Sequence, residues 1–164
     1  MKMTSLINIF CIASLVFWAG GAWGEEFCVD PGGTGTHTDL NAALAAAAAN
    51  GDDDIVRVAQ GTYTGKFSYQ SSEGNRIEIL GGYVSGTSCT EREPDPRLTI
   101  LDAAGSGTVL YLYNSNGGDI KVEGFTIQNG VASASQAGGL HTARECQSWQ
   151  GKLPRWLPPR QRWP

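Results

Sequence analysis

The chain has 164 residues, enough for one modest domain, and its 22 glycines suit a fold with many short strands and tight turns. The net charge of −4 hides an asymmetry, because residues 25–140 carry six Lys/Arg against fifteen Asp/Glu, whereas residues 141–164 carry five against one. An acidic body argues against nucleic acid or an anionic membrane as a partner, since phosphate contacts need clustered Lys or Arg.

Residues 1–24 have the features of a secretory signal peptide. Lys2 gives a positive start, residues 6–18 form a nearly unbroken apolar run, and small residues, Ala22 and Gly24, occupy both cleavage-site positions. A membrane anchor is the alternative, but the apolar run is short for a bilayer. The sequence therefore predicts a secreted protein with no stable membrane span after cleavage.

Export would place the remaining cysteines in an oxidising compartment. Cys28 and Cys89 are then the natural disulfide pair, and two free buried thiols are the alternative. Cys146 has no obvious partner.

Residues 25–53 read as an N-terminal cap containing a helix over about 38–50. The alanine-rich run favours a helix, with Thr36 or Thr38 as the N-cap and Asn50-Gly51 at its end. One side of this helix is apolar and consists of Leu40, Ala43, Leu44 and Ala47. Such a helix can cover the first exposed strands of a following β-structure.

Three adjacent carboxylates, Asp52-Asp53-Asp54, raise the hypothesis of a calcium site, because this cation prefers oxygen ligands. Adjacent side chains point in different directions, however, and further ligands at a calcium-loop spacing are absent from the sequence. A solvated turn is the favoured interpretation, and calcium is the one cofactor that the sequence leaves open.

Residues 54–140 carry apolar pairs that alternate with polar residues, as in half-buried strands. The pairs recur at a step of 21 or 22 residues, a spacing typical of stacked β repeats. The predicted fold is therefore all-β, a coil of about four to five stacked turns. The predicted core stack consists of Val56, Val58, Ile77, Ile79, Leu98, Ile100, Ile120, Val122, Phe125 and Ile127.

Several short motifs resemble the repeats of pectin-lyase-like β-helix proteins. They are Val58–Tyr63, Leu80–Tyr83, Thr99–Asp102 and the Ile120–Gly130 unit. The glycine-rich run at 137–140 is similar to repeats of bacterial surface proteins, including polymorphic outer-membrane proteins and adhesin passengers. The resemblance implies that the stacked turns form a right-handed parallel β-helix. It also implies a secreted or cell-surface protein, including one associated with a bacterial outer membrane, and an N-terminal fragment of a longer chain. It is weak for activity, because this scaffold hosts lyases, hydrolases and adhesins alike.

Residues 141–164 break the pattern. Apolar alternation stops, the charge changes sign, and the segment holds three tryptophans and four of the seven prolines. These features predict disorder and suggest a shifted reading frame or a truncated chain. A genuine basic binding tail is the alternative. In either case the last β-turn has no visible cap, which predicts self-association through its open edge.

No catalytic residues are predicted. The best-placed carboxylates are Asp102, Asp119 and Glu123, and hydrolases use such groups as acid and base. Neither His37 nor His141 has neighbours that suggest nucleophilic catalysis. A second set of side chains is predicted to project outward from the strands as a solvated ladder: Arg57, Arg76, Glu78, Thr99 and Lys121. Within this ladder, Arg57 and Glu78 could form an ion pair.

Three functions remain open. The favoured one is a non-catalytic scaffold or adhesin-type fragment that contacts an extracellular polysaccharide or a surface protein. The second is the N-terminal part of a polysaccharide lyase or glycoside hydrolase whose catalytic turns are missing. The third is a carbohydrate-binding module that uses exposed aromatic residues, namely Tyr63, Tyr69, Tyr83, Tyr111 and Tyr113.

Overall fold

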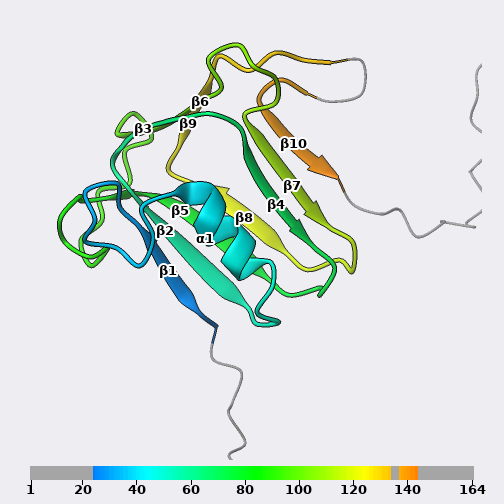
Figure 1. Cartoon of the computed structure of the whole chain (residues 1–164), viewed down its shortest axis with the longest axis horizontal. Helices are drawn as coiled ribbons and strands as arrows, with labels where there is room; N and C mark the ends of the chain where they lie inside the picture. The colour runs from blue at the N-terminus through cyan, green and yellow to red at the C-terminus, as the bar shows by residue number, and fades with distance from the viewer. Residues whose placement is uncertain (1–23, 134–136, 144–164) are drawn as a thin grey trace, which may run out of the picture.

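The computed structural model describes residues 24–133 and 137–143 (Figure 1). Its elements in chain order are β1 (Glu26–Val29), α1 (Leu40–Ala47), β2 (Asp54–Ala59), β3 (Gly61–Thr64), β4 (Phe67–Ser71), β5 (Ile77–Tyr83), β6 (Thr99–Asp102), β7 (Leu110–Asn114), β8 (Ile120–Glu123), β9 (Thr126–Gln128) and β10 (Leu140–Ala143). The predicted signal peptide up to residue 23, Cys146 and the tail beyond residue 143 lie outside the described residues. Within the described part, no helix is long and apolar enough to span a membrane.

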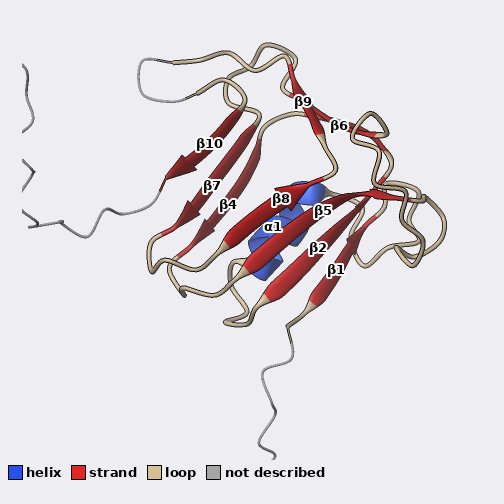
Figure 2. Ribbon diagram, turned by 180° about the vertical axis from the view of Figure 1, so that it is seen from behind, coloured by secondary structure: helices blue, strands red, loops and turns tan. Residues whose placement is uncertain are grey.

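The strands form three short sheets, with the orders β1-β2-β5-β8, β10-β7-β4 and β3-β6-β9. Every pairing between these strands is parallel. From β2 onward, consecutive strands belong to different sheets, so β5, β6 and β7 contribute one strand to each (Figure 2). Parallel neighbours are therefore separated by long stretches of sequence, as parallel pairing requires.

The prediction of a right-handed parallel β-helix with four to five turns is wrong. The described strands form three separate short parallel sheets with one helix, and the constant step of 21 or 22 residues is absent. Val56 pairs with Ile79, 23 residues later, and Ile79 pairs directly with Val122, 43 residues later. The step fails because the intervening segment, 84–98, is a long connection rather than a further strand of this sheet.

The pair Leu98 and Ile100 does not belong to the predicted stack. Ile100 lies in β6, which pairs with β3 in a different sheet, and both side chains are only half-buried. Thr99 and Leu101 point inward instead and are fully buried. The Thr99 hydroxyl can be buried because it accepts a 2.9 Å hydrogen bond from the Gly82 amide. Thr99 is therefore not part of an outward ladder.

The other core predictions fall into two groups. Val56, Val58, Ile77 and Ile79 are fully buried. The later members are half-buried and pack against the same core: Ile120, Val122, Phe125 and Ile127. The difference arises because β8 and β9 come last among the described strands of their sheets, so one side of each has no neighbouring strand in this part of the chain.

Helix α1 packs against β4, β1 and β2 (Figure 1). The four residues of its predicted apolar side are buried. It is shorter than the predicted 38–50, and its N-cap is Asp39 rather than Thr36 or Thr38. The Asp39 carboxylate accepts a 2.8 Å hydrogen bond from the Ala42 amide.

Strand pairing crosses two of the boundaries predicted from the sequence, the one between residues 53 and 54 and the one between residues 140 and 141. Strand β1 lies in the predicted cap but pairs with β2 along its whole length. Strand β10 crosses the predicted break at residue 140, because His141–Ala143 pair with β7 just as Leu140 does. Regular pairing therefore extends into the first residues of the segment predicted to be aberrant.

Candidate functional site

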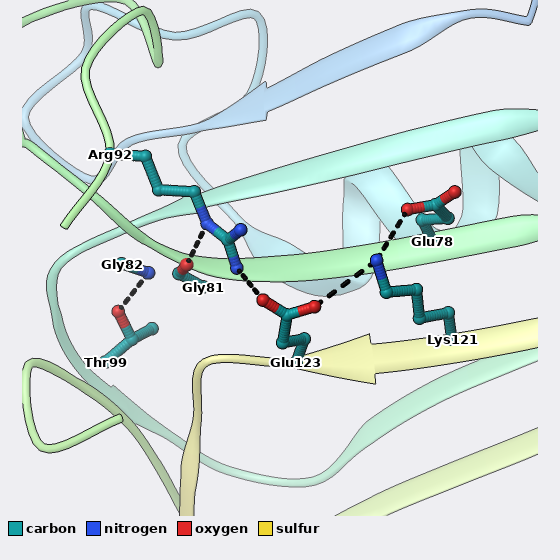
Figure 3. A network of polar contacts seen from close by, with 7 residues as sticks. All are labelled: Glu78, Gly81, Gly82, Arg92, Thr99, Lys121 and Glu123. Atoms are coloured by element: carbon teal, nitrogen blue, oxygen red, sulfur yellow. Dashed lines mark hydrogen bonds and ion pairs between the residues drawn. The ribbon is translucent and has the colours of Figure 1, made fainter. Parts of the chain in front are cut away.

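The outer face of the β1-β2-β5-β8 sheet carries a line of paired charges, which we call the charged network: Glu78, Arg92, Lys121 and Glu123 (Figure 3). The Lys121 ammonium lies 3.3 Å from a carboxylate oxygen of Glu78 and 3.3 Å from one of Glu123. Arg92 contacts the other Glu123 oxygen at 3.1 Å. Register explains the centre of this arrangement, because Glu78 and Lys121 are directly opposite each other in β5 and β8.

Arg92 comes from the connection between β5 and β6, not from a strand of the sheet. An antiparallel bridge between Tyr83 and Arg92 holds it beside β5, and its Nε donates a 3.0 Å hydrogen bond to the Gly81 carbonyl. Arg92 is not among the site residues predicted from the sequence. A single arginine in a long connection has no signal that could have identified its partner.

The network continues toward β1 through an aromatic ring. Tyr83 lies between two guanidinium groups, 5.7 Å from Arg57 and 5.6 Å from Arg92, distances at which a cation interacts with the ring face. Arg57 pairs with Glu26 at 2.6 Å. The predicted pairing of Arg57 with Glu78 is wrong, because Arg57 is opposite Leu80, and Glu78 pairs with Arg76 and Lys121 instead.

Two of the three carboxylates that were candidates for acid–base chemistry, Glu123 and Asp102, lie in different sheets and are held in their charged form. Hydrogen bonding to Lys121 and Arg92 lowers the pKa of Glu123. In the β3-β6-β9 sheet, the Ala104 amide lowers the pKa of Asp102, with help from Gln128 and Asn129. A general acid needs the opposite shift, so neither group is poised to donate a proton near neutral pH.

Asp119, the third candidate, lies just before β8. Asp119 is exposed, and its backbone carbonyl accepts a 2.9 Å hydrogen bond from the Ile77 amide. Its role in the fold is therefore to align β8 with β5. The structure brings none of the three carboxylates together.

A shallow hollow of about 190 Å³ opens where β1, β2 and β5 begin. Its lining is mostly acidic, with one arginine: Gly24, Glu26, Asp53, Asp54, Ile55, Arg76 and Glu78. Arg76 and Glu78 form an ion pair with each other. The charges of Arg76 and Glu78, which line the β5 side of the hollow, therefore balance each other.

The three adjacent aspartates separate as the sequence predicts. The Asp53 carboxylate accepts a 2.8 Å hydrogen bond from the Arg76 amide, while Asp54 turns inward and is only 2% exposed. The interpretation of all three as a solvated turn is wrong for Asp54, which begins β2. Within 24–133 and 137–143, no group of three or more His, Cys, Asp or Glu side chains is arranged to hold a metal ion.

Most of the tyrosines considered as a sugar platform are buried, namely Tyr63, Tyr69 and Tyr83. Tyr111 and Tyr113 remain half-exposed on the outer face of β7. The ring of His141, from β10, stacks on Tyr111 with a centroid distance of 5.5 Å and an interplanar angle of 11°. The other histidine, His37, lies 5.5 Å from the Phe27 ring near the chain start.

A junction between β1 and the connection after β5 combines a disulfide with a buried carboxylate. The predicted Cys28–Cys89 disulfide is confirmed. Asp30, which is 1% exposed, accepts hydrogen bonds from the Thr34 hydroxyl at 2.5 Å, the Gly86 amide at 2.8 Å, and the Gly32 amide and Ser85 hydroxyl at 2.9 Å. These donors lower the pKa of Asp30 to about 2. Asp30 is not among the residues predicted from the sequence, because two of its hydrogen-bond partners, Ser85 and Gly86, lie far away in the chain.

The fold and these contacts define a disulfide-linked protein built of short parallel sheets with a charge-paired outer face. Comparison with protein-family models, with curated proteins and with solved structures found no match. The resemblance to pectin-lyase-like proteins therefore stays a prediction that rests on short motifs.

Proposed function

We propose that this chain is a non-catalytic extracellular scaffold, of the kind that presents a binding surface or serves in adhesion. The observation that carries the proposal is the charged network, in which the candidate acid Glu123 contacts two cations. A carboxylate held in this way keeps its charge and orders the surface around it, whereas a catalytic acid must release a proton.

The disulfide supports the extracellular part of the proposal. Disulfides persist in oxidising compartments and are rare where glutathione keeps thiols reduced. Cys28 and Cys89 are 8% and 2% exposed, so this bond is structural rather than accessible for redox chemistry. Together with the predicted signal peptide, it favours a protein that functions outside the cytoplasm.

A direct test is to incubate the disulfide-bonded protein with polygalacturonate and calcium, and to measure unsaturated products and new reducing ends. A pectate lyase serves as the positive control. We expect no product above the protein-free background. Product formation would overturn the proposal in favour of a lyase or a hydrolase.

Carbohydrate binding is a second candidate, favoured by the aromatic strip on β7. Tyr111 and Tyr113 are two positions apart in a strand, so they share one face with a spacing of about 7 Å. Their neighbours on β4 are polar, because Ser68 is opposite Tyr111 and Gln70 is opposite Tyr113. Half-exposed rings flanked by hydrogen-bonding groups suit the apolar face and hydroxyls of a sugar.

A glycan array followed by titration calorimetry tests this candidate. The Tyr111→Ala/Tyr113→Ala variant should weaken binding of any array hit about tenfold, corresponding to about 1.4 kcal/mol. Thr62→Ala, at an exposed position of β3 in another sheet, is the matched control and should leave affinity unchanged. The candidate fails if no glycan binds, or if both variants bind as tightly as the parent chain.

A further inference from the structure

Asp54 is a buried carboxylate with one unsatisfied oxygen. Its Oδ1 atom accepts hydrogen bonds from the Asn50 side-chain amide at 2.9 Å and from the Glu25 backbone nitrogen at 3.2 Å. Its Oδ2 atom is buried and has no hydrogen-bond partner within the described part of the chain. An unpaired charged oxygen is costly to bury, so this arrangement requires a further donor.

The surroundings of Asp54 lack a cation that could supply this donor. Burial raises the pKa of Asp54, and the nearby carboxylates of Glu25 and Asp52 raise it further. Arg76 lines the same hollow, but its guanidinium pairs with Glu78. No ion pair to Asp54 is present among the residues that the structure describes. The missing element is therefore a positive group next to the Glu25 nitrogen.

The Glu25 nitrogen is the atom that signal-peptide cleavage would change. The small residues Ala22 and Gly24 predict cleavage directly before Glu25. Gly24 lies so close to the residue before β2 that a Cβ at position 24 would overlap the Asp53 carbonyl oxygen. Glycine at this position therefore satisfies both the tight packing and the preference of signal peptidases for a small residue.

We propose that cleavage after Gly24 converts the Glu25 amide into an α-ammonium group that forms a buried ion pair with Asp54. A signal peptidase hydrolyses the Gly24–Glu25 peptide bond. Water supplies the oxygen of the new Gly24 carboxylate, and the Glu25 nitrogen takes up protons. The proposal rests on the predicted signal peptide and is independent of the proposed function.

The geometry needs little change for this ion pair to form. The Glu25 carbonyl accepts a 3.0 Å hydrogen bond from the Ile55 amide, so residue 25 is already held beside β2. A peptide amide has one N–H with a fixed direction, whereas an ammonium group has three that can rotate. The new group can therefore donate to Oδ2 as well as to Oδ1, and it adds the missing positive charge. The ion pair would hold β1 against β2 in the mature chain.

The test compares two disulfide-bonded chains that differ only at the N-terminus. One begins at Glu25, and the other carries a Ser-Gly extension that keeps the Glu25 nitrogen in an amide bond. In urea unfolding at pH 6.5, the chain with the free terminus should have an unfolding constant at least tenfold smaller. Equal stability of the two chains would overturn the proposal, as would mass spectrometry showing that the exported protein begins at another residue.

Substitutions then identify the partner. Asp54→Asn introduced into both chains should reduce their stability difference to less than twofold. Asp53→Asn, which removes the same charge from the same hollow, is the matched control and should leave the difference intact. If the difference survives in the Asp54→Asn pair, Asp54 is not the partner.

A titration provides a second readout that does not depend on the folding of a variant. The α-amino pKa is ordinarily 7.7–8.0, and pairing with Asp54 should raise it. The carboxylates of Glu25 and Asp52 and the Tyr69 hydroxyl on β4 are close enough to interact with Asp54 and add no positive charge. The hollow adds Glu26, Asp53 and the ion pair of Arg76 with Glu78. Because the pKa is raised on folding, the stability advantage is fully present below the ordinary α-amino pKa, where Asp54 remains ionised, and is lost as the pH rises through the folded-state value. An α-amino pKa at or below its ordinary value in the folded chain, measured by NMR titration, would refute the ion pair.

Discussion

Removing the Cys28–Cys89 disulfide should strongly destabilise the fold. We consider the double substitution Cys28→Ala/Cys89→Ala, which leaves no free thiol at either position. The bond joins β1 to the connection after β5 and closes a loop of 61 residues. Restricting a loop of that length in the unfolded chain is worth about 4 kcal/mol by the chain-entropy estimate. In a domain of this size, such a loss lowers the melting temperature by roughly 15 °C.

Urea unfolding monitored by far-UV circular dichroism measures this loss of stability. Two signatures distinguish loss of the cross-link from loss of packing around it. The variant should show a larger dependence of unfolding free energy on urea concentration, because its unfolded chain is more expanded. A reductant should also destabilise the parent protein by a similar amount and leave the variant unchanged.

The reasoning would be refuted by a variant within about 1 kcal/mol of the parent. That outcome would mean that the unfolded chain stays compact without the cross-link. A variant that loses stability while its urea dependence stays constant would place the contribution in native packing with Leu80 and Tyr83, which cluster with the two cysteines.

Three further predictions concern charge and assembly. Folding lowers the pKa of Asp30 to about 2, so its contribution is complete above the ordinary value of 3.8 and is lost as the pH falls toward 2; Asp30→Asn should remove this part of the acid dependence of the urea midpoint. Glu123→Gln should shift the urea midpoint only slightly, since the ion pair with Arg92 is partly solvated, and a strong coupling between Arg92→Ala and Glu123→Gln in a double-mutant cycle would contradict this. β10 is an edge strand and Leu140 on it is 42% exposed, so we expect concentration-dependent self-association in sedimentation velocity that Leu140→Lys reduces. Val131→Lys, at a 52% exposed position outside the strands, is the control, and equal effects of both substitutions would argue against edge pairing.

The failures of sequence-based prediction share one cause. Alternation identifies which residues of a strand share a face, but the partner of that strand depends on the length and path of the connections. Residues 84–98 separate β5 from β6 and supply Arg92 to the charged network, and neither effect follows from the alternation pattern. A regular step between apolar pairs therefore did not correspond to regular pairing, and Thr99 rather than Ile100 became buried.

The sequence by itself determined the local features of this protein. These are the Cys28–Cys89 pairing, the apolar side of α1 and the inward direction of Val56, Val58, Ile77 and Ile79. Each follows from residue type or from the local period of a helix or a strand, which requires no knowledge of distant segments. Only the tertiary structure decided the sheet partners, the burial of Asp30 and Asp54 and the partners of Arg57, because each depends on backbone hydrogen bonds and carboxylate contacts between segments far apart in the chain.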